Sequence, residues 1–558
     1  MRHCFLALLL ATTSLFAAPP LPIGPAATVR VNSIGFLPNA IKHATALESV
    51  TEFRVLRIEG DNTREVYRGT AGQPMRAIAS DTQERLRTLD FSSITEPGRY
   101  VIETRDAQRS AEFSIGNDVW NSPFEVVTHA MYLWRCGTEV RGEWQGIHYH
   151  QEPCHLEDGW LDHVGGGPHQ HRSVGGWHDA GDYNKYVVNA GVSVGLMLKA
   201  FEHFPERIHG VNTNIPESTN NTPDILDEVR WELEWLFTMQ LADGRVYHKL
   251  SALDFSYWGP PANDQSKRYF APWGTAATAH FTAMMANAAR VFRPFDAEFA
   301  DRCLEAAKKS WDCLQRHPKP VIPDQSRFKT GSYEARDDSP RLWAAAEMWK
   351  ATGDIAALRE FERRARSLHF TENGPSWAEV QDLGFSVYLL SEYKNKTDDP
   401  RDPRLVKRLT NEVIERAQSA VKEARNNPHA RPFGVARKRW FWGCNGNVAG
   451  QTFHLHLADR LNPDPSYRAT ALDALGHLFG RNYHGRSYVT GLGANPPQHP
   501  HDRRGEPAWP GYLVGGGWPD GRSWVDELAS YERNEIAINW NAALIYALAA
   551  FVDPSASE

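Results

Sequence analysis

The sequence has no cluster of basic charge and no long apolar run beyond its first 18 residues. Its 61 Lys and Arg are outnumbered by 68 Asp and Glu, and both signs are mixed along the chain. A protein that binds nucleic acid or an anionic membrane surface shows a clustered basic excess instead. A helix that spans a bilayer needs about 20 apolar residues. We therefore expect no nucleic-acid partner and no membrane span.

Cysteine is also scarce, with six in 558 residues. One lies in the first 18 residues, and the other five are Cys136, Cys154, Cys303, Cys313 and Cys444. An odd number is a poor disulfide framework for an exported protein. Cys303 and Cys313 share a helical pattern, and ten residues of helix separate Cα atoms by about 15 Å, whereas a disulfide allows about 7 Å. We predict that these two are packed thiols.

The first 18 residues have a composition of their own. They begin Met1-Arg2 and continue through an apolar run to Ala17-Ala18, before two prolines. A basic start, a short apolar stretch and small residues at the end are typical of a secretory signal peptide. We predict a signal peptide over residues 1–18 and a secreted or periplasmic protein.

Two regions with different apolar periodicity follow. Between residues 28 and 115, short runs such as FRVLRI and GRYVIET alternate with a period of two and are separated by turn residues. This pattern predicts an all-β, immunoglobulin-like sandwich over residues 19–116. From Trp120 onward the apolar residues recur at helical spacing, between long loops rich in Gly, Pro, His and Trp. Residues 117–558 are therefore predicted to form an all-α toroid of helix pairs.

Tryptophan is abundant, with 19 residues against 8 Met, and none of them precedes Trp120. Indole rings usually pack in a core, but they also stack on the flat faces of sugars. Composition alone favours the core. Several of these tryptophans nevertheless stand in loops beside the polar motifs described next, where sugar stacking is the better interpretation.

The segment GGWHDAGDYNKY begins at Gly175 and places Asp179 and Asp182 in a glycine-flanked turn before a helix. Helix capping would account for one aspartate but not for both together with the Trp and His. Glu535 lies at the entry to the last apolar helix, and a solvated glutamate at a helix start is the plainer interpretation of that segment alone. His501 and Arg503 stand in a proline-rich loop between the two segments.

Together the three segments resemble glycoside hydrolase family 9, cellulases with an (α/α)6 barrel. DAGD, SYVTGLGANPPQHPHDR and SYERNEIAINWN occur in the family's order, and VRVNSIGFLPNAIKHA resembles its N-terminal immunoglobulin-like domain. The resemblance implies an inverting mechanism with Glu535 as general acid, Asp182 as general base and Asp179 holding the water. It also implies that His501 and Arg503 contact sugar hydroxyls and that Trp540 lines the cleft.

The activity implied is that of an endo-β-1,4-glucanase acting on cellulose-type glucans, as a monomer. An exo-acting β-glucosidase or exo-β-glucosaminidase on oligosaccharides is the alternative, and a non-catalytic carbohydrate-binding protein is a third. The family's second histidine in its PHHR motif is Asp502 here. This departure lies in a loop beside the substrate subsites and leaves endo action as the default.

A second group of residues, two cysteines and two histidines, predicts a metal site. Cys136, Cys154, His155 and His178 supply two sulfurs and two imidazoles, the ligand set of a closed, structural zinc site. The spacing also resembles a zinc-carrying branch of the family. A Cys136–Cys154 disulfide is the alternative in an exported protein.

A calcium loop is implied by the resemblance alone. The segment IPESTNNTPDILDE offers Glu217, Asn221, Asp224 and Asp227 as oxygen donors. Capping of the helix that follows explains the same residues nearly as well.

Overall fold

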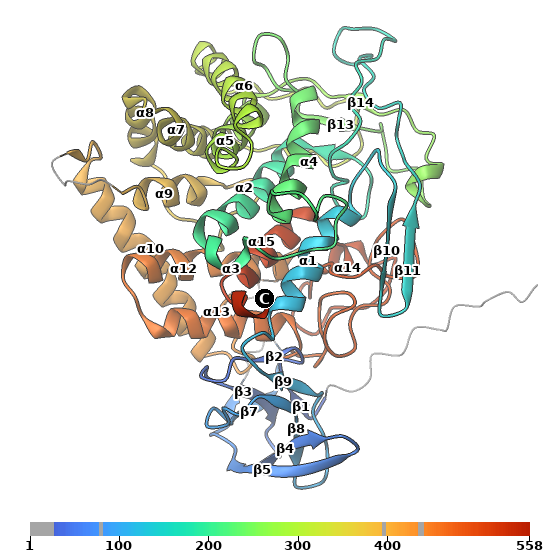
Figure 1. The fold of residues 1–558 in the computed structure, drawn as a ribbon, viewed down its shortest axis with the longest axis vertical. Helices are drawn as coiled ribbons and strands as arrows, with labels where there is room; N and C mark the ends of the chain where they lie inside the picture. The colour runs from blue at the N-terminus through green and yellow to red at the C-terminus, as the bar shows by residue number, and fades with distance from the viewer. Residues whose placement is uncertain (1–26, 77–81, 393–397, 434–439, 558) are drawn as a thin grey trace, which may run out of the picture.

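The computed structural model describes residues 27–76, 82–392, 398–433 and 440–557. The predicted signal peptide over residues 1–18 lies outside the described residues. Two regions follow one another along the chain, a strand-rich domain and a larger helical one. In the view of Figure 1 the strand-rich domain lies below the helical domain.

The first region consists of two sheets that enclose one apolar core. Their strand orders are β1-β3-β7-β6 and β2-β9-β8-β4-β5, and all pairs are antiparallel except β2–β9. The bounds are β1 Val29–Arg30, β2 Gly35–Phe36, β3 His43–Leu47, β4 Glu52–Glu59, β5 Asn62–Thr70, β6 Met75–Arg76, β7 Arg85–Asp90, β8 Gly98–Thr104 and β9 Phe113–Ile115. Alternate residues face the core, as the period of two predicts.

The second region alternates helices that are buried all round with helices that, apart from the first, are exposed along one face. The buried set is α2 Val187–His203, α5 Thr275–Val291, α7 Asp338–Thr352, α9 Gln381–Leu389, α12 Thr452–Leu461 and α15 Ile538–Ala549. The other set is α1 Asn121–Leu133, α4 Asp224–Thr238, α6 Ala297–Arg316, α8 Ile355–Ala365, α10 Pro403–Arg425 and α13 Pro465–Leu478. A helix that is buried all round belongs to the centre of a large domain, so the first set forms the inner ring.

Short elements complete the second region. They are α3 Pro205–Ile208, α11 Cys444–Gly450, α14 Tyr531–Asn534, the hairpin β10 Val140–Trp144 with β11 Ile147–Gln151, and the small sheet of β12 Lys185–Tyr186, β13 Lys249–Ser251 and β14 Tyr269–Phe270. Short 3-10 turns span Pro261–Asn263 and Pro554–Ser557. The helical periodicity did not predict these strands, which lie in the long loops.

Hydrogen bonds tie the two regions together. Thr45 of β3 donates through Oγ1 to the carbonyl of Pro428 at 2.6 Å and accepts from Nε of Arg481 at 3.0 Å. Ser33 donates through Oγ to the carbonyl of Phe479 at 2.7 Å. These groups are buried or nearly so, which makes the contact a fixed interface rather than a loose tether.

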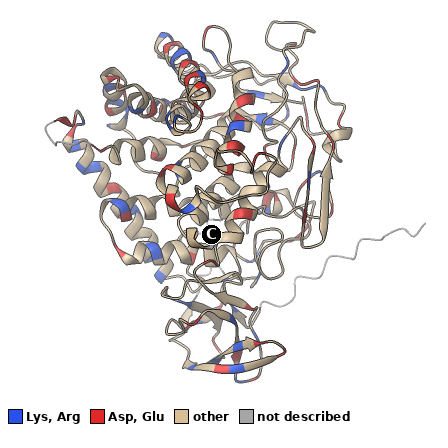
Figure 2. Ribbon diagram, in the orientation of Figure 1, with Lys and Arg blue, Asp and Glu red and all other residues tan. Residues whose placement is uncertain are grey.

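Charged residues of both signs are distributed over the molecule. Acidic and basic residues are interspersed over the ribbon, and neither sign gathers on one element (Figure 2). Within the described residues no helix has the length and apolar character needed to cross a membrane. Cys303 and Cys313 are buried free thiols in α6, which confirms that prediction.

Candidate active site

A cleft of about 1010 Å³ opens where the inner helices begin, and all three predicted catalytic carboxylates line it. Asp179 and Asp182 come from the loop before α2, whereas Glu535 lies between α14 and α15. The fold therefore brings together the motifs from the two ends of the helical region.

The loop that carries Asp179 and Asp182 contacts the segments around Ile538 and Arg503 through main-chain hydrogen bonds. The carbonyl of Asp179 accepts from the amide of Ile538 at 3.0 Å, and the carbonyl of Gly181 accepts from the amide of Arg503 at 3.1 Å. A Cβ on Gly181 would lie 2.2 Å from the carbonyl oxygen of His501. Glycine is required in DAGD because any side chain there would push the loops apart.

Asp179 and Asp182 are buried carboxylates that accept hydrogen bonds. Asp179 accepts from Asn189 and from the hydroxyl of Tyr333, each at 2.7 Å. Asp182 accepts from the side-chain amide of Asn184 at 2.6 Å and from its backbone amide at 3.2 Å. The N-cap of α2 is Tyr186, so Asp182 does not cap that helix.

Burial and mutual repulsion dominate the charges of this pair. Burial, and then the charge of Asp182, raises the pKa of Asp179 to about 8. Burial also raises the pKa of Asp182, while the nearby Arg503 guanidinium and the Asn184 bonds act in the opposite direction. Asp182 is thus the member of the pair with a cation beside it to favour its ionised form.

Glu535 is buried as well but has fewer hydrogen-bond donors around its side chain. Burial, and then the charges of Asp182 and Asp179, raise its pKa well above the usual range. Its backbone is fixed, because its carbonyl accepts from Gly515 at 2.9 Å and the preceding carbonyl, of Asn534, accepts from His501 at 2.8 Å. Trp442 donates its indole N–H to Oε2 at 2.9 Å. A carboxyl held protonated at the edge of a cleft is suited to act as a general acid.

Of the predicted substrate-binding residues, Trp540 lines the cleft, whereas His501 and Arg503 lie beside the carboxylates but are not among the residues that line it. His501 bonds through Nδ1 to the carbonyl of Leu528 at 2.6 Å, which leaves Nε2 for another partner. Arg503 donates to the carbonyl of Tyr257 at 2.9 Å, and its Nε has no hydrogen-bond partner among the described residues. Trp540 lines the cleft and packs closely on Gly443 and Gly446.

Several aromatic residues of the site were not predicted. Phe255, Tyr333, Trp377 and Trp442 line the cleft. The exposed ring of Trp258 packs on His501 at 5.4 Å. The available signal was the run FSYW and the tryptophans in loops without helical periodicity.

Asp502, the departure from the family's PHHR motif, is buried. It forms an ion pair with Arg504 at 2.6 Å, and Arg504 also donates to the hydroxyl of Tyr512 at 2.7 Å. The departure therefore bears on the support of the loop, since Asp502 is not among the residues that line the cleft.

The four predicted metal ligands form one buried cluster. The candidate ligand atoms of Cys136, Cys154, His155 and His178 lie within 4.8 Å of one another, and both thiols are free in this structure. Cys136 Sγ lies 3.7 Å from Nδ1 of His155, and Cys154 Sγ lies 3.7 Å from Nε2 of His178.

The surroundings of the cluster also suit a metal. Although burial acts the other way, the hydrogen bond from Cys154 and the charges of Lys185 and Arg268 lower the pKa of Cys136 well below its usual range. The second ring nitrogen of His155 faces Asp264 at 3.3 Å, the kind of carboxylate partner that orients a metal-bound histidine. Two sulfurs and two imidazoles fit zinc.

The predicted calcium ligands bind protein groups instead. Glu217 forms an ion pair with Arg135 at 3.0 Å, and Asp224 accepts from the amide of Thr213 at 2.6 Å. Asp227 accepts from Asn220 at 2.9 Å, and burial raises its pKa to about 6. Asn221 is exposed. Calcium binding stays a prediction.

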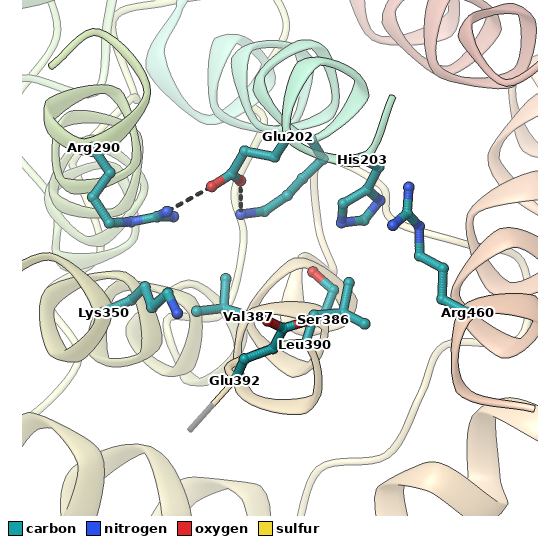
Figure 3. A pocket seen from close by; sticks show the side chains of 10 residues that line it. Glu202, His203, Arg290, Lys350, Ser386, Val387, Leu390, Glu392 and Arg460 are labelled. Atoms are coloured by element: carbon teal, nitrogen blue, oxygen red, sulfur yellow. Dashed lines mark hydrogen bonds and ion pairs between the residues drawn. The ribbon is translucent and has the colours of Figure 1, made fainter. Parts of the chain in front are cut away.

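A second cavity, of about 230 Å³, lies at the opposite end of the inner helices (Figure 3). Its central charges are paired, because Lys199 and Arg290 bind Glu202 at 2.5 and 2.6 Å and also contact the buried Glu347. None of the predicted catalytic or binding residues lines it. We therefore place the active site at the larger cleft.

Comparison with known proteins identifies the family. Residues 121–548 match the model described as glycosyl hydrolase family 9, and residues 25–109 match the cellulase N-terminal ig-like domain. The protein is a glycoside hydrolase. More particularly, the chain belongs to glycosyl hydrolase family 9.

Relatives match over nearly the whole chain. Endoglucanase D of Acetivibrio thermocellus is 46% identical over 95% of this chain and 81% of its own length. A xyloglucan-specific endo-beta-1,4-glucanase of Bacteroides ovatus is 31% identical over 99% and 98%. The crystal structure of a metagenome-derived family 9 endoglucanase has a TM-score of 0.86 and 34% identity, over 94% of this chain and 98% of that one.

These matches confirm the predicted fold, an immunoglobulin-like domain followed by an (α/α)6 barrel. Another similar structure is a Zn-binding triple mutant of a family 9 endoglucanase, with a TM-score of 0.84 and 29% identity over 93% of this chain and 99% of that one.

Proposed function

We propose that the protein is an inverting endo-β-1,4-glucanase in which Glu535 is the general acid and Asp182 the general base. The observation that carries this proposal is that Asp182 and Glu535 line one cleft with different numbers of donors around them. Burial and the neighbouring aspartates raise the pKa of Glu535 well above the usual range, and Trp442 is its one side-chain donor among the described residues, whereas Asp182 accepts from both amides of Asn184. Few donors favour the protonated form of Glu535, and more donors favour the ionised form of Asp182.

The reaction follows from these two states. Glu535 gives its proton to the glycosidic oxygen as the bond to the anomeric carbon breaks. Asp182 removes a proton from a water that attacks the opposite face of the sugar, so the anomeric configuration inverts. Asp179, held by Asn189 and Tyr333, would orient that water.

The shape of the cleft supports a polymeric substrate. Its volume is about 1010 Å³, and aromatic rings from separate loops, including Phe255, Trp377 and Trp442, line it. Rings spaced along a cleft suit a chain of sugars that stacks and hydrogen-bonds at the same time. Endo action on β-1,4-glucan is consistent with the endoglucanases among the relatives.

Product analysis tests the activity. On carboxymethyl cellulose, endo action predicts a rapid fall in viscosity with few new reducing ends, and proton NMR should show the α-anomer first. Release of monosaccharide alone, or a β-anomeric first product, would contradict the proposal. Glu535→Gln should abolish hydrolysis, with Glu532→Gln, on the short helix α14 that directly precedes Glu535, as the matched control.

We also propose that the Cys136, Cys154, His155 and His178 cluster holds a structural zinc ion that anchors the loop carrying Asp179. His178 directly precedes Asp179, and four protein ligands leave no open position for water. Metal analysis of protein purified without added zinc should find about one ion per chain, the occupancy of a closed four-ligand site. Metal-free protein with an oxidised cysteine pair would contradict this.

Four further proposals extend the sequence predictions: export directed by residues 1–18, domain boundaries at 19–116 and 117–558, a monomeric state, and calcium at Glu217, Asn221, Asp224 and Asp227. N-terminal sequencing of secreted protein tests the export proposal, which an intact N-terminus would contradict, and limited proteolysis tests the domain boundary, which cleavage away from residue 117 would contradict. Light scattering tests the monomeric state, which a dimer mass would contradict. Calcium titration tests the calcium site, which the absence of calcium uptake would contradict.

A further inference from the structure

The carboxyl group of Glu535 accepts a hydrogen bond from one donor among the described side chains. Trp442 donates its indole N–H to Oε2 at 2.9 Å. Asp179, by contrast, accepts from two side chains, and Asp182 accepts from both amides of Asn184. The orientation of the Glu535 carboxyl group therefore rests on the indole.

The turn that carries Trp442 is bonded to the segment that fixes the Glu535 backbone. The amide of Asn445 donates to the carbonyl of Gly515 at 3.0 Å, and the amide of Gly515 donates to the carbonyl of Glu535 at 2.9 Å. Gly443 follows Trp442 with φ of 84°, a left-handed conformation that favours glycine. The indole and the carboxyl are thus held on one connected backbone frame.

The chemistry of indole makes this contact directional. Its N–H is a donor only, so the oxygen that it contacts must accept. The carbonyl oxygen of a carboxylic acid is a better acceptor than its hydroxyl oxygen, so protonated Glu535 is favoured with its hydrogen on Oε1, the other oxygen. We propose that Trp442 is a positioning residue that places the acidic proton of Glu535 on Oε1 and orients it for delivery to the glycosidic oxygen. This inference rests on the proposed role of Glu535 as the general acid.

The same bond affects when Glu535 loses its proton. The groups that act on it are Asp182 and Asp179, which favour the protonated form, and the indole and Arg503, which favour the ionised form. Tyr333, within electrostatic range, is itself held neutral by a pKa raised far above 10. Removing the indole N–H leaves the carboxylate less stabilised, so the pKa of Glu535 should rise and the basic limb of the pH–rate profile should move to higher pH.

The variant Trp442→Phe tests the inference, because it keeps a ring and removes the donor. The side chain is 44% exposed, so the smaller ring should be accommodated without disturbing the fold. On cello-oligosaccharides we expect kcat to fall about tenfold, the effect of losing one hydrogen bond to an ionisable group, with a smaller change in KM.

The leaving group provides the decisive comparison. An aryl cellobioside whose phenol is a strong acid needs little protonation, so Trp442→Phe should hydrolyse it at nearly the wild-type kcat. Trp442→His, which restores a ring N–H, should recover part of the loss on cello-oligosaccharides. Trp518→Phe is the matched control, since this ring is 38% exposed and does not line the cleft.

Equal losses on both substrates, with the basic limb unmoved, would overturn the positioning role and leave the ring as a packing or stacking surface. That outcome is separate from failure of the proposed function. Hydrolysis by Glu535→Gln at the wild-type rate on cello-oligosaccharides would remove the general acid itself, and the inference with it.

Discussion

The two sides of the cleft are built differently. On the side of the proposed base, called the base side here, Asp179 and Asp182 lie in a buried loop beside the Cys/His cluster. Arg268 donates both to the carbonyl of Tyr183 and to Cys136 Sγ. On the acid side, Glu535 is held through its backbone and through the single indole contact from Trp442. The base side has many constraints on its side chains, whereas the acid side has few.

The difference follows from what each group must do. A base that remains a carboxylate in a buried site needs donors and cations around it, and each one also fixes its position. An acid that must hold a proton is better surrounded by few donors and by negative charge. Abundant hydrogen bonding on the acid side would ionise Glu535 and defeat its role.

The largest expected effects come from removing either reacting carboxyl group. Glu535→Gln and Asp182→Asn should each lower kcat about 10²–10⁴-fold, the usual contribution of a general acid or base. Both variants should fold, as judged by circular dichroism. Assays on cello-oligosaccharides measure kcat. Near-wild-type turnover by either variant would contradict the proposed role of that carboxyl group and, with it, the distinction between an acid side and a base side.

Asp179→Asn should lose less activity, about 10–100-fold, because the water loses one oriented acceptor but the base remains. This variant should also be more stable at neutral pH. The native pKa of Asp179, about 8, lies above the ordinary aspartate pKa of 3.8, so native Asp179 binds more protons than the unfolded chain between those values. Its contribution to stability therefore falls as pH rises from about 4 to 8.

Thermal unfolding at pH 4 and pH 8 measures that effect. The variant should have a higher Tm than the wild type at pH 8, and the two should differ less at pH 4. A variant with a lower Tm at pH 8 would show that the bonds from Asn189 and Tyr333 outweigh the burial of charge.

Removal of the proposed zinc should affect stability and the base side together. Cys136→Ser should lose the metal and lower Tm by several degrees, because a structural metal stabilises the folded state only. Its kcat should fall through displacement of the loop that carries Asp179. Cys313→Ser, a buried thiol in α6 away from the cluster, is the control and should retain metal, Tm and kcat. Retention of zinc by Cys136→Ser would contradict the ligand set.

The smallest effect is expected where the two domains meet. Thr45→Val removes a buried hydroxyl that donates to Pro428 and accepts from Arg481. We expect a loss of about 1–3 kcal/mol in the free energy of unfolding, with kcat and KM unchanged. Urea denaturation measures it, and Thr88→Val on the neighbouring strand β7 is the control. A change in kcat would show that this interface also supports the cleft.

The sequence was sufficient where chemistry is concentrated in short segments. Two aspartates in a glycine turn stood out by their residue types, whereas the resemblance to the family was needed to select the glutamate before the last helix as the proposed acid. The clustering of Cys136 and Cys154 with two histidines was predictable for the same reason, since sulfur and imidazole signal a metal.

The remaining parts of the site depend on contacts between distant loops. Trp442 and Tyr333 belong to segments with no periodicity, and nothing local shows that they reach Glu535 and Asp179. The role of Asp502 was also hidden, because its ion pair with Arg504 depends on a turn that only the folded loop forms. Loop conformation is set by tertiary packing, which a single sequence does not display.

The hydrogen bond from Ile538 to the carbonyl of Asp179 has a consequence for biosynthesis. It joins the first inner helix, α2, to the last, α15, so the ring closes at the catalytic centre itself. A nascent chain that ends before Glu535 has the Asp179 loop but neither the proposed acid nor the Ile538 amide that supports that loop. We therefore expect hydrolysis only after α15 has been made and the ring has closed, and chains truncated before Glu535 should be inactive rather than weakened enzymes.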